Sequence, residues 1–424
     1  MSSKQPAIAI GIDVGTSGVR AAALSASGDM IAFAAAPFAN SLETRQPSAW
    51  WHGVCECLAQ LAGQTSLASV EGIAVDGTSG TVLSVDADGK ALGGVLMYND
   101  PCPDEDIVQK IAAVAPADSP ARGANSGLAR AIHLGRDAKA VHVVHQADWI
   151  LMQLGLETPI SDENNALKSG YDLEHETWPE WIASAGMDIE RLPVVTRAGA
   201  RLAPMGAAAS QFGLPSTCRF HAGTTDGCAS FLATGASDIG DGVTALGSTI
   251  VLKLASDQPI SAPEYGIYAH RVLGFWLVGG ASNSGGAVIK ALIGDERLEE
   301  LTGRLYLGKP TRLDYYPLLK PGERFPINDP AYAPRLEPRP ADDAIFFQAI
   351  LEGMTNIERL GYERLEALGA PKLRSVRTVG GGARNPVWST MRQKALGVAM
   401  PAPRSAEAAV GAASLVLSAG SLTS

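Results

Sequence analysis

An aspartate at the end of an apolar run is the first residue in the sequence that could do chemistry. Ala7–Ile12 is apolar, and the segment 13–18 (DVGTSG) separates it from a second apolar run, Val19–Leu24. This pattern predicts a strand, a tight glycine-rich turn and another strand. At such a turn the Asp13 carboxylate can hold Mg²⁺, while backbone N–H groups and the Thr16 hydroxyl point at a phosphate. Taken alone, the pattern also fits an ordinary hairpin turn.

A second turn of small residues repeats this plan near the middle of the chain. The apolar runs Val243–Leu246 and Ile250–Leu254 are separated by Gly247, Ser248 and Thr249. The two turns lie just over half the chain apart, which predicts two similar halves that each open with a hairpin. Small residues at both turns would let the backbone approach a polyphosphate.

Asp226 is the third candidate, because it follows a glycine- and threonine-rich segment, 223–225, and precedes an apolar helix predicted over Cys228–Thr234. The dipole at a helix N-terminus favours an ionised carboxylate, which can accept a proton from a substrate. Helix capping is the ordinary role of an aspartate at such a position.

Three consecutive glycines, 380–382, form the fourth candidate. They separate the apolar run Val376–Val379 from a helix predicted over Asn385–Leu396. Without Cβ atoms, the main chain can lie directly against a flat ring or a ribose. A simple loop seldom needs three glycines, so the pattern favours ligand binding.

The composition excludes several classes of protein. The 424 residues include 34 basic and 44 acidic side chains, for a net charge of −10, and 46% are apolar. A globular protein of two or three domains is therefore expected, with no basic surface for nucleic acid or anionic membranes. Five cysteines without a CxxC pair predict reduced thiols in a cytoplasmic protein. Neither a secretory leader nor a membrane-spanning segment is expected.

Strands that alternate with helices predict an α/β fold. Further strands are predicted at Gly72–Val75 and Thr81–Val85. Further helices are predicted at Ala138–Leu154, Asn283–Leu292, Ile345–Leu368 and Glu407–Leu417. The sequence has no P-loop motif and no GxGxxG between a strand and a helix, so any nucleotide must be bound in another way. Glycine and proline residues near His221 predict a domain boundary there.

The two hairpins, Asp226 and the glycine-rich loop together resemble the FGGY family of carbohydrate kinases, within the actin, hexokinase and Hsp70 superfold. The segments that occur in family order are 72–100, 162–169, 192–195, 213–215, 222–227, 316–318, 322–324 and 380–388. The resemblance implies a two-domain, ribonuclease H-like α/β fold with an ATP–sugar cleft between the domains. Residues 1–221 would carry the sugar and the phosphate–Mg²⁺ site, and residues 222–424 the nucleotide.

The resemblance also implies transfer of the γ-phosphate of Mg·ATP to the terminal hydroxyl of a small ketose. Asp226 would receive the hydroxyl proton, and Asp13 would hold the magnesium. The expected ATP ligands are Thr16, Gly247, Ser248, Thr249, Gly381, Gly382 and Asn385. The expected sugar ligands are Ser17, Gly18, Ser79, Asp226 and Asp100, with His145 and Asp162 as weaker candidates. His145 also fits a buried histidine whose hydrogen bonds are satisfied within the fold.

The sequence departs from the family pattern where the sugar binds. Thr78, Ser79 and Gly80 stand where Gln-Met-His is usual, and the element around Asp100 lacks its usual Trp and Arg. The compact chain most resembles the short sugar kinases of cyanobacteria and plants, which implies D-ribulose as substrate. D-xylulose, glycerol or another polyol is the alternative, and a sugar-independent ATPase of the same fold is a rival from another class. The expected state is a monomer or homodimer whose partners are ATP and a ketopentose.

Overall fold

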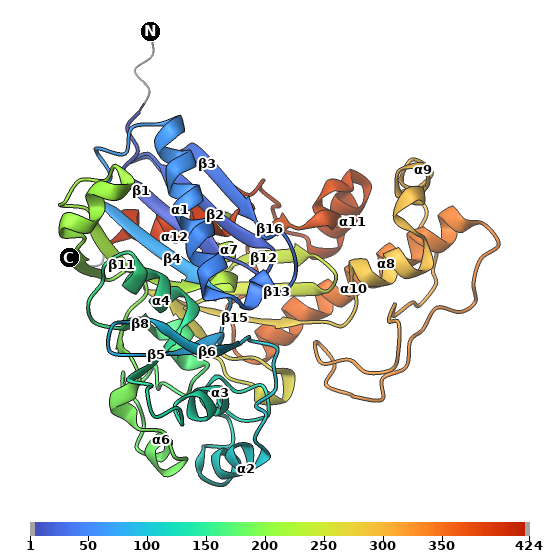
Figure 1. Ribbon diagram of the computed structural model, residues 1–424. Helices are drawn as coiled ribbons and strands as arrows, with labels where there is room; N and C mark the ends of the chain where they lie inside the picture. Colours follow the sequence, from blue (N-terminus) through green and yellow to red (C-terminus); the bar gives the residue numbers. More distant parts are fainter. Residues whose placement is uncertain (1–4, 420–424) are drawn as a thin grey trace. The chain divides into compact units, whose positions relative to one another are not determined.

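The computed structural model describes residues 5–419, which form two compact units (Figure 1). The first unit contains the described residues up to Ala233, the short segment His270–Gly274 and the described residues from Glu407 onward. The second unit contains Thr234–Ala269 and Phe275–Ala406. The last helix of the chain therefore belongs to the same unit as the first strand.

The first unit is built on a six-stranded sheet with the order β10-β11-β4-β1-β2-β3. Its strands are β1 (Ala9–Val14), β2 (Gly18–Leu24), β3 (Met30–Pro37), β4 (Gly72–Gly77), β10 (Arg201–Pro204) and β11 (Arg219–Thr225). β1 is antiparallel to β2 and parallel to β4, and β4 is parallel to β11. The carboxyl ends of β1, β4 and β11 therefore meet at one edge. The strands predicted here are confirmed, with ends that differ by two residues at most.

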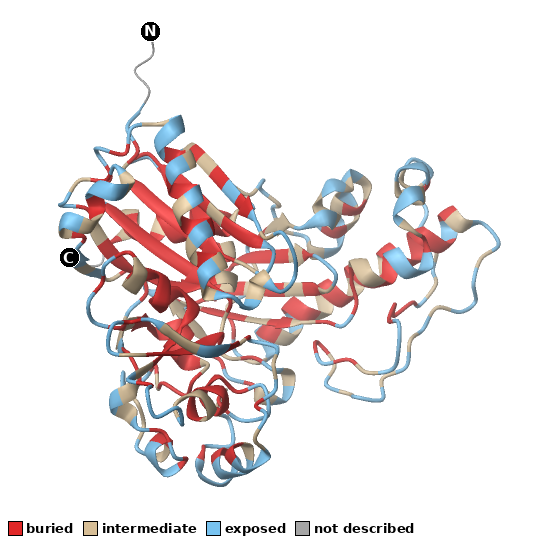
Figure 2. Cartoon of the chain, in the orientation of Figure 1, coloured by how far each residue is buried: buried red, intermediate tan, exposed pale blue. Residues whose placement is uncertain are grey.

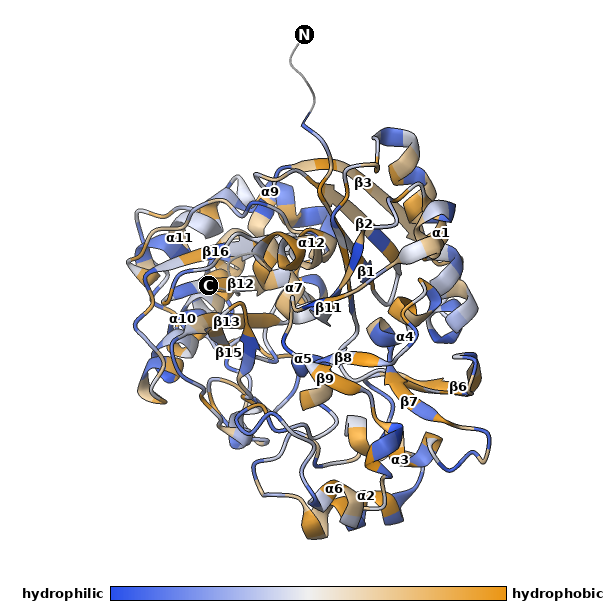
Figure 3. Ribbon diagram, turned by 90° about the vertical axis from the view of Figure 1, so that its left-hand side faces the viewer, coloured by the Kyte–Doolittle hydropathy of each residue, from blue (hydrophilic) through white to orange (hydrophobic). Residues whose placement is uncertain are grey.

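Helices cover both faces of this sheet. α1 (Pro47–Gln64) packs on β2 and β3, while α12 (Ala408–Ser418) packs on β1, β4 and α7 (Asp226–Ala233). The inner strands β1, β2, β4 and β11 and most of α12 are buried (Figure 2), and α12 is hydrophobic along most of its length (Figure 3).

Glycines allow α12 to approach its neighbours main chain to main chain. A Cβ at Gly11 would lie 2.0 Å from Ala409 O, and a Cβ at Gly411 would lie 1.8 Å from Ala229 O. Either added atom would clash with backbone, so these contacts require glycine.

A smaller layer of the first unit contains a three-stranded sheet with the order β6-β5-β7. The strands are β5 (Val82–Val85), β6 (Ala91–Leu96) and β7 (His142–His145), followed by the parallel pair β8 (Ile160–Asp162) and β9 (Val194–Thr196). The helices are α2 (Glu105–Val114), α3 (Gly127–Leu134), α4 (Gln146–Gln153), α5 (Glu163–Leu167) and α6 (Trp181–Ser184). The short strand β14 (His270–Val272) packs on α5.

The helix predicted over Ala138–Leu154 is wrong in its first half. Residues 142–145 form β7, which pairs with β5, and the helix begins only at Gln146. β-Branched Val143 and Val144 fit a strand. The His145 backbone is extended, and its N–H donates to the side chain of Asp148 in the first turn of the new helix at 3.0 Å.

The second unit repeats the strand plan of the first. Its sheet contains β15 (Phe275–Ala281), β13 (Ile250–Ser256), β12 (Asp241–Leu246) and β16 (Ser375–Val379), in that spatial order. β12 is antiparallel to β13 and parallel to β16, as β1 is to β2 and β4. This repetition confirms the two similar halves that the turns predicted.

The helices of the second unit are α8 (Gly286–Leu292), α9 (Leu298–Thr302), α10 (Asp343–Ala367) and α11 (Pro386–Leu396). The helices predicted at the positions of α8, α10 and α11 are confirmed, and α8 begins three residues later than expected. Short 3₁₀ turns across the chain are 43–45, 189–191, 206–212, 263–265, 295–297 and 381–384.

A buried ion pair ties the second sheet to its helices. The Arg392 guanidinium of α11 donates to both oxygens of Glu358 in α10, at 2.6 Å each, and to Thr378 in β16. Thr244 of β12 donates to the same Glu358. Because both charges are buried and fully paired, these elements are held in one arrangement. Within residues 5–419, no helix has the length and apolar character needed to cross a membrane.

Candidate active site

Three carboxylates lie at the edge where the parallel strands of the first unit end. Asp13 of β1 stands opposite Asp76 of β4, and Thr224 of β11 stands opposite Asp76 on the other side. Asp226 follows two residues later, as the first residue of α7. The predicted pair Asp13 and Asp226 thus lies at one edge of the sheet, in β1 and directly after β11, and the strand between these two carries a third acid, Asp76.

Burial and mutual repulsion set the protonation of this group. Burial raises the pKa of Asp13 to about 6, opposed by the Asp76 carboxyl and by Arg20, whose guanidinium lies 3.6 Å from Asp13. Burial and the neighbouring Asp13 raise the pKa of Asp76 well above its ordinary value. No N–H or O–H group of the described residues donates to either Asp76 oxygen. Burial and the neighbouring carboxylates therefore favour the protonated form of Asp76.

Asp76 was not recognised in the sequence as a functional residue. The segment 76–79 (DGTS) closely repeats 13–17 (DVGTS), each after an apolar run. This repetition is the sequence feature that could have identified Asp76 as a second acid like Asp13.

Asp226 is placed as predicted, at a helix N-terminus. The Cys228 N–H donates to Thr225 Oγ1 at 3.4 Å, so a capping hydrogen bond comes from Thr225. One oxygen of Asp226 accepts the N–H of Gly227 at 2.7 Å.

The remaining predicted ligands of the first unit, Thr16 for phosphate and Ser17, Gly18 and Ser79 for the sugar, lie at the β1–β2 turn and in the loop after β4. Thr16 and Ser17 are exposed in the β1–β2 turn, and Arg20 donates to Ser17 Oγ at 3.3 Å. Gly18 has φ +151°, and a Cβ there would lie 2.5 Å from Ala36 O, so its glycine is required by the fold. Ser79 lies in the loop after β4 with a buried hydroxyl that has no hydrogen-bond partner among the described residues.

Asp100 already has partners. Arg45 donates to both of its oxygens, and the Met97 N–H donates to Oδ2 at 2.8 Å. The Arg45 guanidinium lowers the pKa of Asp100.

Two residues that the sequence did not single out shape the loop that carries Ser79. Buried Arg130 donates to the carbonyls of Gly80, Tyr98 and Asp100, which joins the two loops. Buried Gln146 accepts the Thr78 N–H through Oε1 at 2.9 Å, and its Nε2 has no partner in the described part of the chain. These residues lie far from the loop in sequence, so no local pattern could have identified them.

His145 and Asp162 have structural partners. The Nδ1 of buried His145 lies 2.9 Å from Asp148 Oδ2, and its Nε2 lies 3.1 Å from Ser169 Oγ. Asp162 caps α5 by accepting the N–H groups of Asn164 and Asn165. The interpretation of His145 as a satisfied histidine agrees with these contacts.

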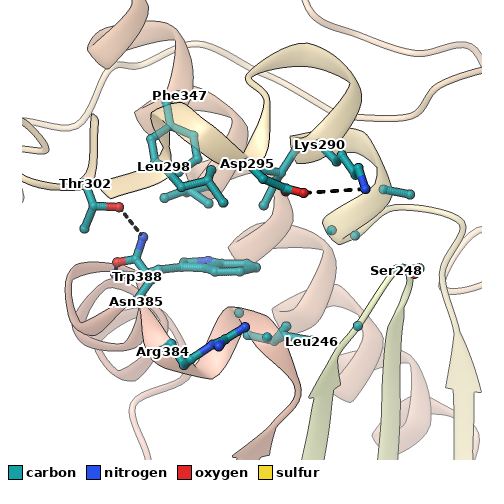
Figure 4. Close-up of a pocket in the computed structure, with 18 of the residues that line it drawn as sticks. Leu246, Ser248, Lys290, Asp295, Leu298, Thr302, Phe347, Arg384, Asn385 and Trp388 are labelled. Carbon is teal, nitrogen blue, oxygen red and sulfur yellow. Dashed lines mark hydrogen bonds and ion pairs between the residues drawn. The ribbon is translucent and has the colours of Figure 1, made fainter. Parts of the chain in front are cut away.

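The second unit contains a cavity of about 750 Å³ above the ends of β12 and β16 (Figure 4). Five predicted ATP ligands line it: Gly247, Ser248, Gly381, Gly382 and Asn385. Apolar walls come from Leu246, Leu298, Phe347 and Trp388. Thr249 adjoins it, because a Cβ at the lining residue Gly285 would lie 2.6 Å from Thr249 Cα. Glycine backbone beside apolar side chains suits a purine nucleotide.

The three consecutive glycines have different reasons to be glycine. Gly380 has φ +88°, and a Cβ there would lie 2.6 Å from Leu246 O. A Cβ at Gly382 would lie 2.7 Å from Leu246 Cβ and from the Trp388 ring. At Gly381 the nearest atom, in Arg384, is 3.7 Å away. The fold therefore needs glycine at 380 and 382, whereas Gly381 leaves space beside the cavity.

Asn385 uses both ends of its amide. Its Oδ1 accepts the Trp388 N–H at 2.9 Å and so caps α11, and its Nδ2 donates to Thr302 of α9 at 3.0 Å (Figure 4). Asn385 therefore fixes the wall of the cavity.

Comparison with known protein families identifies the family to which this chain belongs. The N-terminal domain of the FGGY family of carbohydrate kinases matches residues 8–116, and its C-terminal domain matches residues 242–419. The chain belongs to the FGGY family of carbohydrate kinases. This FGGY chain is accordingly a sugar kinase, and the predicted family is confirmed.

Solved structures agree with the FGGY fold. A xyloylose kinase from Brucella ovis is 23% identical with a TM-score of 0.83, covering 97% of this chain and 90% of that one. A xylulose kinase from Rhodospirillum rubrum is 24% identical with a TM-score of 0.82 and the same coverage. Plasmodium falciparum glycerol kinase with ADP is 13% identical with a TM-score of 0.77, covering 97% and 89%. The predicted two-domain, actin- and hexokinase-like α/β fold is confirmed.

A magnesium ion fits the donors of this FGGY kinase only in its usual water-rich form. In residues 5–419 no group of three or more His, Cys, Asp or Glu side chains is arranged to hold a metal. Mg²⁺ commonly takes one or two carboxylates and completes its shell with water and phosphate oxygens. Asp13 is a suitable carboxylate, and among residues 5–419 its one ion-pair partner is Arg20 at 3.6 Å.

Proposed function

We propose that this kinase transfers the γ-phosphoryl group of Mg·ATP to the terminal hydroxyl of D-ribulose, giving the 5-phosphate. The observation that carries the proposal is the placement of Asp226 beside Asp13 and Asp76 at one strand edge. Phosphoryl transfer needs positioning and charge neutralisation more than covalent help from the protein. The first unit would supply these to the sugar, and the second unit would hold the nucleotide.

Asp226 would accept the proton of the attacking hydroxyl. Its position at the start of α7 places this carboxyl at the positive end of the helix dipole. Asp13 would hold the magnesium directly or through water, and the bound ion would neutralise charge on the phosphates. Thr16 would hold a phosphate oxygen from the β1–β2 turn.

The cavity of the second unit would bind ATP. Gly381 would offer bare main chain to the adenosine, and Ser248 would offer its backbone N–H to the phosphates. The Gly247 N–H donates to Thr249 O at 3.2 Å, so Gly247 would contribute a close approach of the main chain. Thr249 would contribute its hydroxyl, whereas Gly382 and Asn385 would shape the wall.

Small residues after β4 favour a ketopentose. Ser79 Oγ, Gln146 Nε2 and both Asp76 oxygens are buried polar atoms without partners among the described residues. Buried polar groups are normally hydrogen-bonded. The hydroxyl groups of a sugar can make the hydrogen bonds that these atoms lack. Ser17, Gly18 and, more weakly, Asp100 complete the proposed sugar site. D-Xylulose is the second candidate, because solved structures of similar fold are described as xylulose kinases.

Release of ADP across D-ribulose, D-xylulose, ribitol, D-arabitol and glycerol tests the proposal, with the phosphorylated carbon identified by NMR. We expect the highest kcat/KM with D-ribulose and phosphate on carbon 5. D-Xylulose differs from D-ribulose only in configuration at carbon 3. A higher kcat/KM with D-xylulose would make that sugar the substrate in place of D-ribulose. ADP release that no sugar stimulates would contradict the kinase proposal and favour an ATPase.

We further propose a reduced, cytoplasmic setting and a monomer or homodimer. All five cysteines are thiols, which supports the reduced setting. Light scattering of the purified protein tests the assembly state.

A further inference from the structure

A second cavity lies within the first unit, apart from the carboxylate edge. Its volume is about 530 Å³, and its walls come from α5, β9, the start of β10 and the segment 270–274. Its charged lining residues are Glu163, Glu176, Arg197, Arg201 and Arg271. Nothing in the proposed kinase reaction uses this cavity.

The positive charges of this cavity outnumber its negative charges. Arg271 donates to Glu163 Oε2 and to Glu176 Oε1, both at 2.8 Å. Arg197 donates to the same Glu176 oxygen at 2.6 Å. Two guanidinium groups therefore share one carboxylate oxygen.

Arg201 adds a third cation that this network does not neutralise. Its side chain is exposed at the start of β10, and no hydrogen-bond or ion-pair partner for it is found in the described residues. Guanidinium groups bind phosphate and carboxylate oxygens in pairs, because their donors match the spacing of those oxygens. Three such groups around one cavity form a surface for a divalent anion.

We propose that this cavity binds a small phosphate ester, whose phosphate takes the place of the Glu176 carboxylate between Arg197 and Arg271 and gains Arg201. The Tyr171 and Thr196 side chains and the cavity volume leave room for the organic part of the ligand. Glu163 is buried and would keep its contact with Arg271.

The cavity is connected to the strand that leads to Asp226. The Arg271 N–H donates to Asn164 Oδ1 at 3.1 Å, and Asn164 Nδ2 donates to Arg271 O and to Thr224 Oγ1. Thr224 lies two residues before Asp226 in the chain. We therefore expect the rate of phosphoryl transfer to change when Arg271 exchanges the Glu176 carboxylate for the phosphate of the ligand.

Calorimetric titration with ribose 5-phosphate, inorganic phosphate and citrate tests the proposal, in protein saturated with ADP so that the nucleotide cavity is occupied. We expect ribose 5-phosphate to bind, Arg201→Ala to weaken it at least tenfold, and Arg136→Ala, which removes an exposed arginine of the same unit, to leave it unchanged. Glu176→Gln should strengthen binding, because it removes the competing carboxylate. If citrate binds as tightly as ribose 5-phosphate, the natural ligand of this cavity is a carboxylate and not a phosphate ester.

Two results would overturn the site: no binding of any of the three probes to the wild type, or equal binding by wild type, Arg201→Ala and Glu176→Gln. A merely structural role of Glu176 predicts weaker binding in Glu176→Gln, the opposite sign. The connection to Asp226 is tested separately by kcat with saturating ester. We expect a change of at least twofold in the wild type and none in Arg201→Ala, and an unchanged wild-type kcat would refute it.

Discussion

The two units share a strand plan but differ in the chemistry at its edge. In each, a hairpin strand pairs with a parallel strand, β1 with β4 and β12 with β16. Where the first unit has Asp13 opposite Asp76, the second has Ala245 opposite Val379, two residues before the turn glycine in both hairpins. One edge is thus acidic, and the other is apolar.

This difference suits the two substrates. A neutral sugar needs acceptors for its hydroxyl protons, and carboxylates supply them. A polyphosphate would be repelled by such carboxylates, whereas the glycine-rich edge of the second unit would let its main chain approach the phosphates. In the proposed reaction, the same scaffold would therefore serve two ligands by exchanging a pair of residues.

Asp226→Asn gives the largest effect that this comparison predicts. The substitution keeps the shape of the side chain but removes the proton acceptor, so kcat for the ketose should fall about 10³-fold. ATP should bind as before, because the nucleotide cavity lies in the second unit. Steady-state ADP release and calorimetry with ATP measure the two properties.

Asp188→Asn is the matched control, because Asp188 is an exposed carboxylate of the same unit. Near-normal turnover in Asp226→Asn would remove Asp226 from the role of base. A loss of ATP binding would show that the two edges do not act separately.

Gly381→Val should weaken ATP binding about tenfold, since overpacking a site commonly costs about 1–3 kcal/mol. The protein itself leaves space for the added side chain, whose nearest neighbour is 3.7 Å from the Cβ position. Sugar affinity and melting temperature should stay near wild type.

Gly382→Val sharpens this test, because its Cβ would clash with Leu246 and Trp388 at 2.7 Å. We expect that variant to lose thermal stability. Unchanged ATP affinity in a stable Gly381→Val protein would place the nucleoside elsewhere.

Asp13→Asn should stabilise the protein at pH 8 in the absence of magnesium. The pKa of Asp13 is raised to about 6, so the folded protein holds this proton more tightly than the unfolded chain. Stability is therefore lost as pH rises from about 4 to about 6 and stays reduced above that. The variant should gain about 3 kcal/mol at pH 8 and little at pH 4.

Thermal unfolding at the two pH values measures this gain. A melting temperature at pH 8 below that of the wild type would mean that ionised Asp13 has better partners than Arg20. The apolar edge of the second unit, with Ala245, has no such cost.

The elements nearest the chemistry were predictable where a local pattern fixes them. Both hairpins, the start of α7 and the glycine loop follow from apolar runs and small residues that need no distant partner. Asp76 was missed because the strand was predicted to end at Val75, so that Asp76 was interpreted as a turn residue. In the structure it lies within β4. Gln146 was missed because the Thr78 N–H that it accepts lies 68 residues earlier in the chain, where no local pattern connects the two.

Other roles depend on partners that sequence cannot show. Asp100 was predicted as a sugar ligand, but Arg45, 55 residues away, occupies both of its oxygens. Asn385 was predicted to contact the nucleoside, and its amide is used by Trp388 and Thr302. A side chain's type gives its capacity for hydrogen bonds, and only the fold determines which are already made.

The main-chain contacts of α12 bear on the order in which this protein can assemble during synthesis. Gly11 of β1 lies against Ala409 of α12, and the whole of the second unit lies between these two residues in the sequence. Because synthesis runs from the amino to the carboxyl end, β1, β4 and α7 can gain their contacts with α12 only after the second unit has been made. The second unit can therefore fold while the chain is still growing, and the first unit completes its packing afterwards.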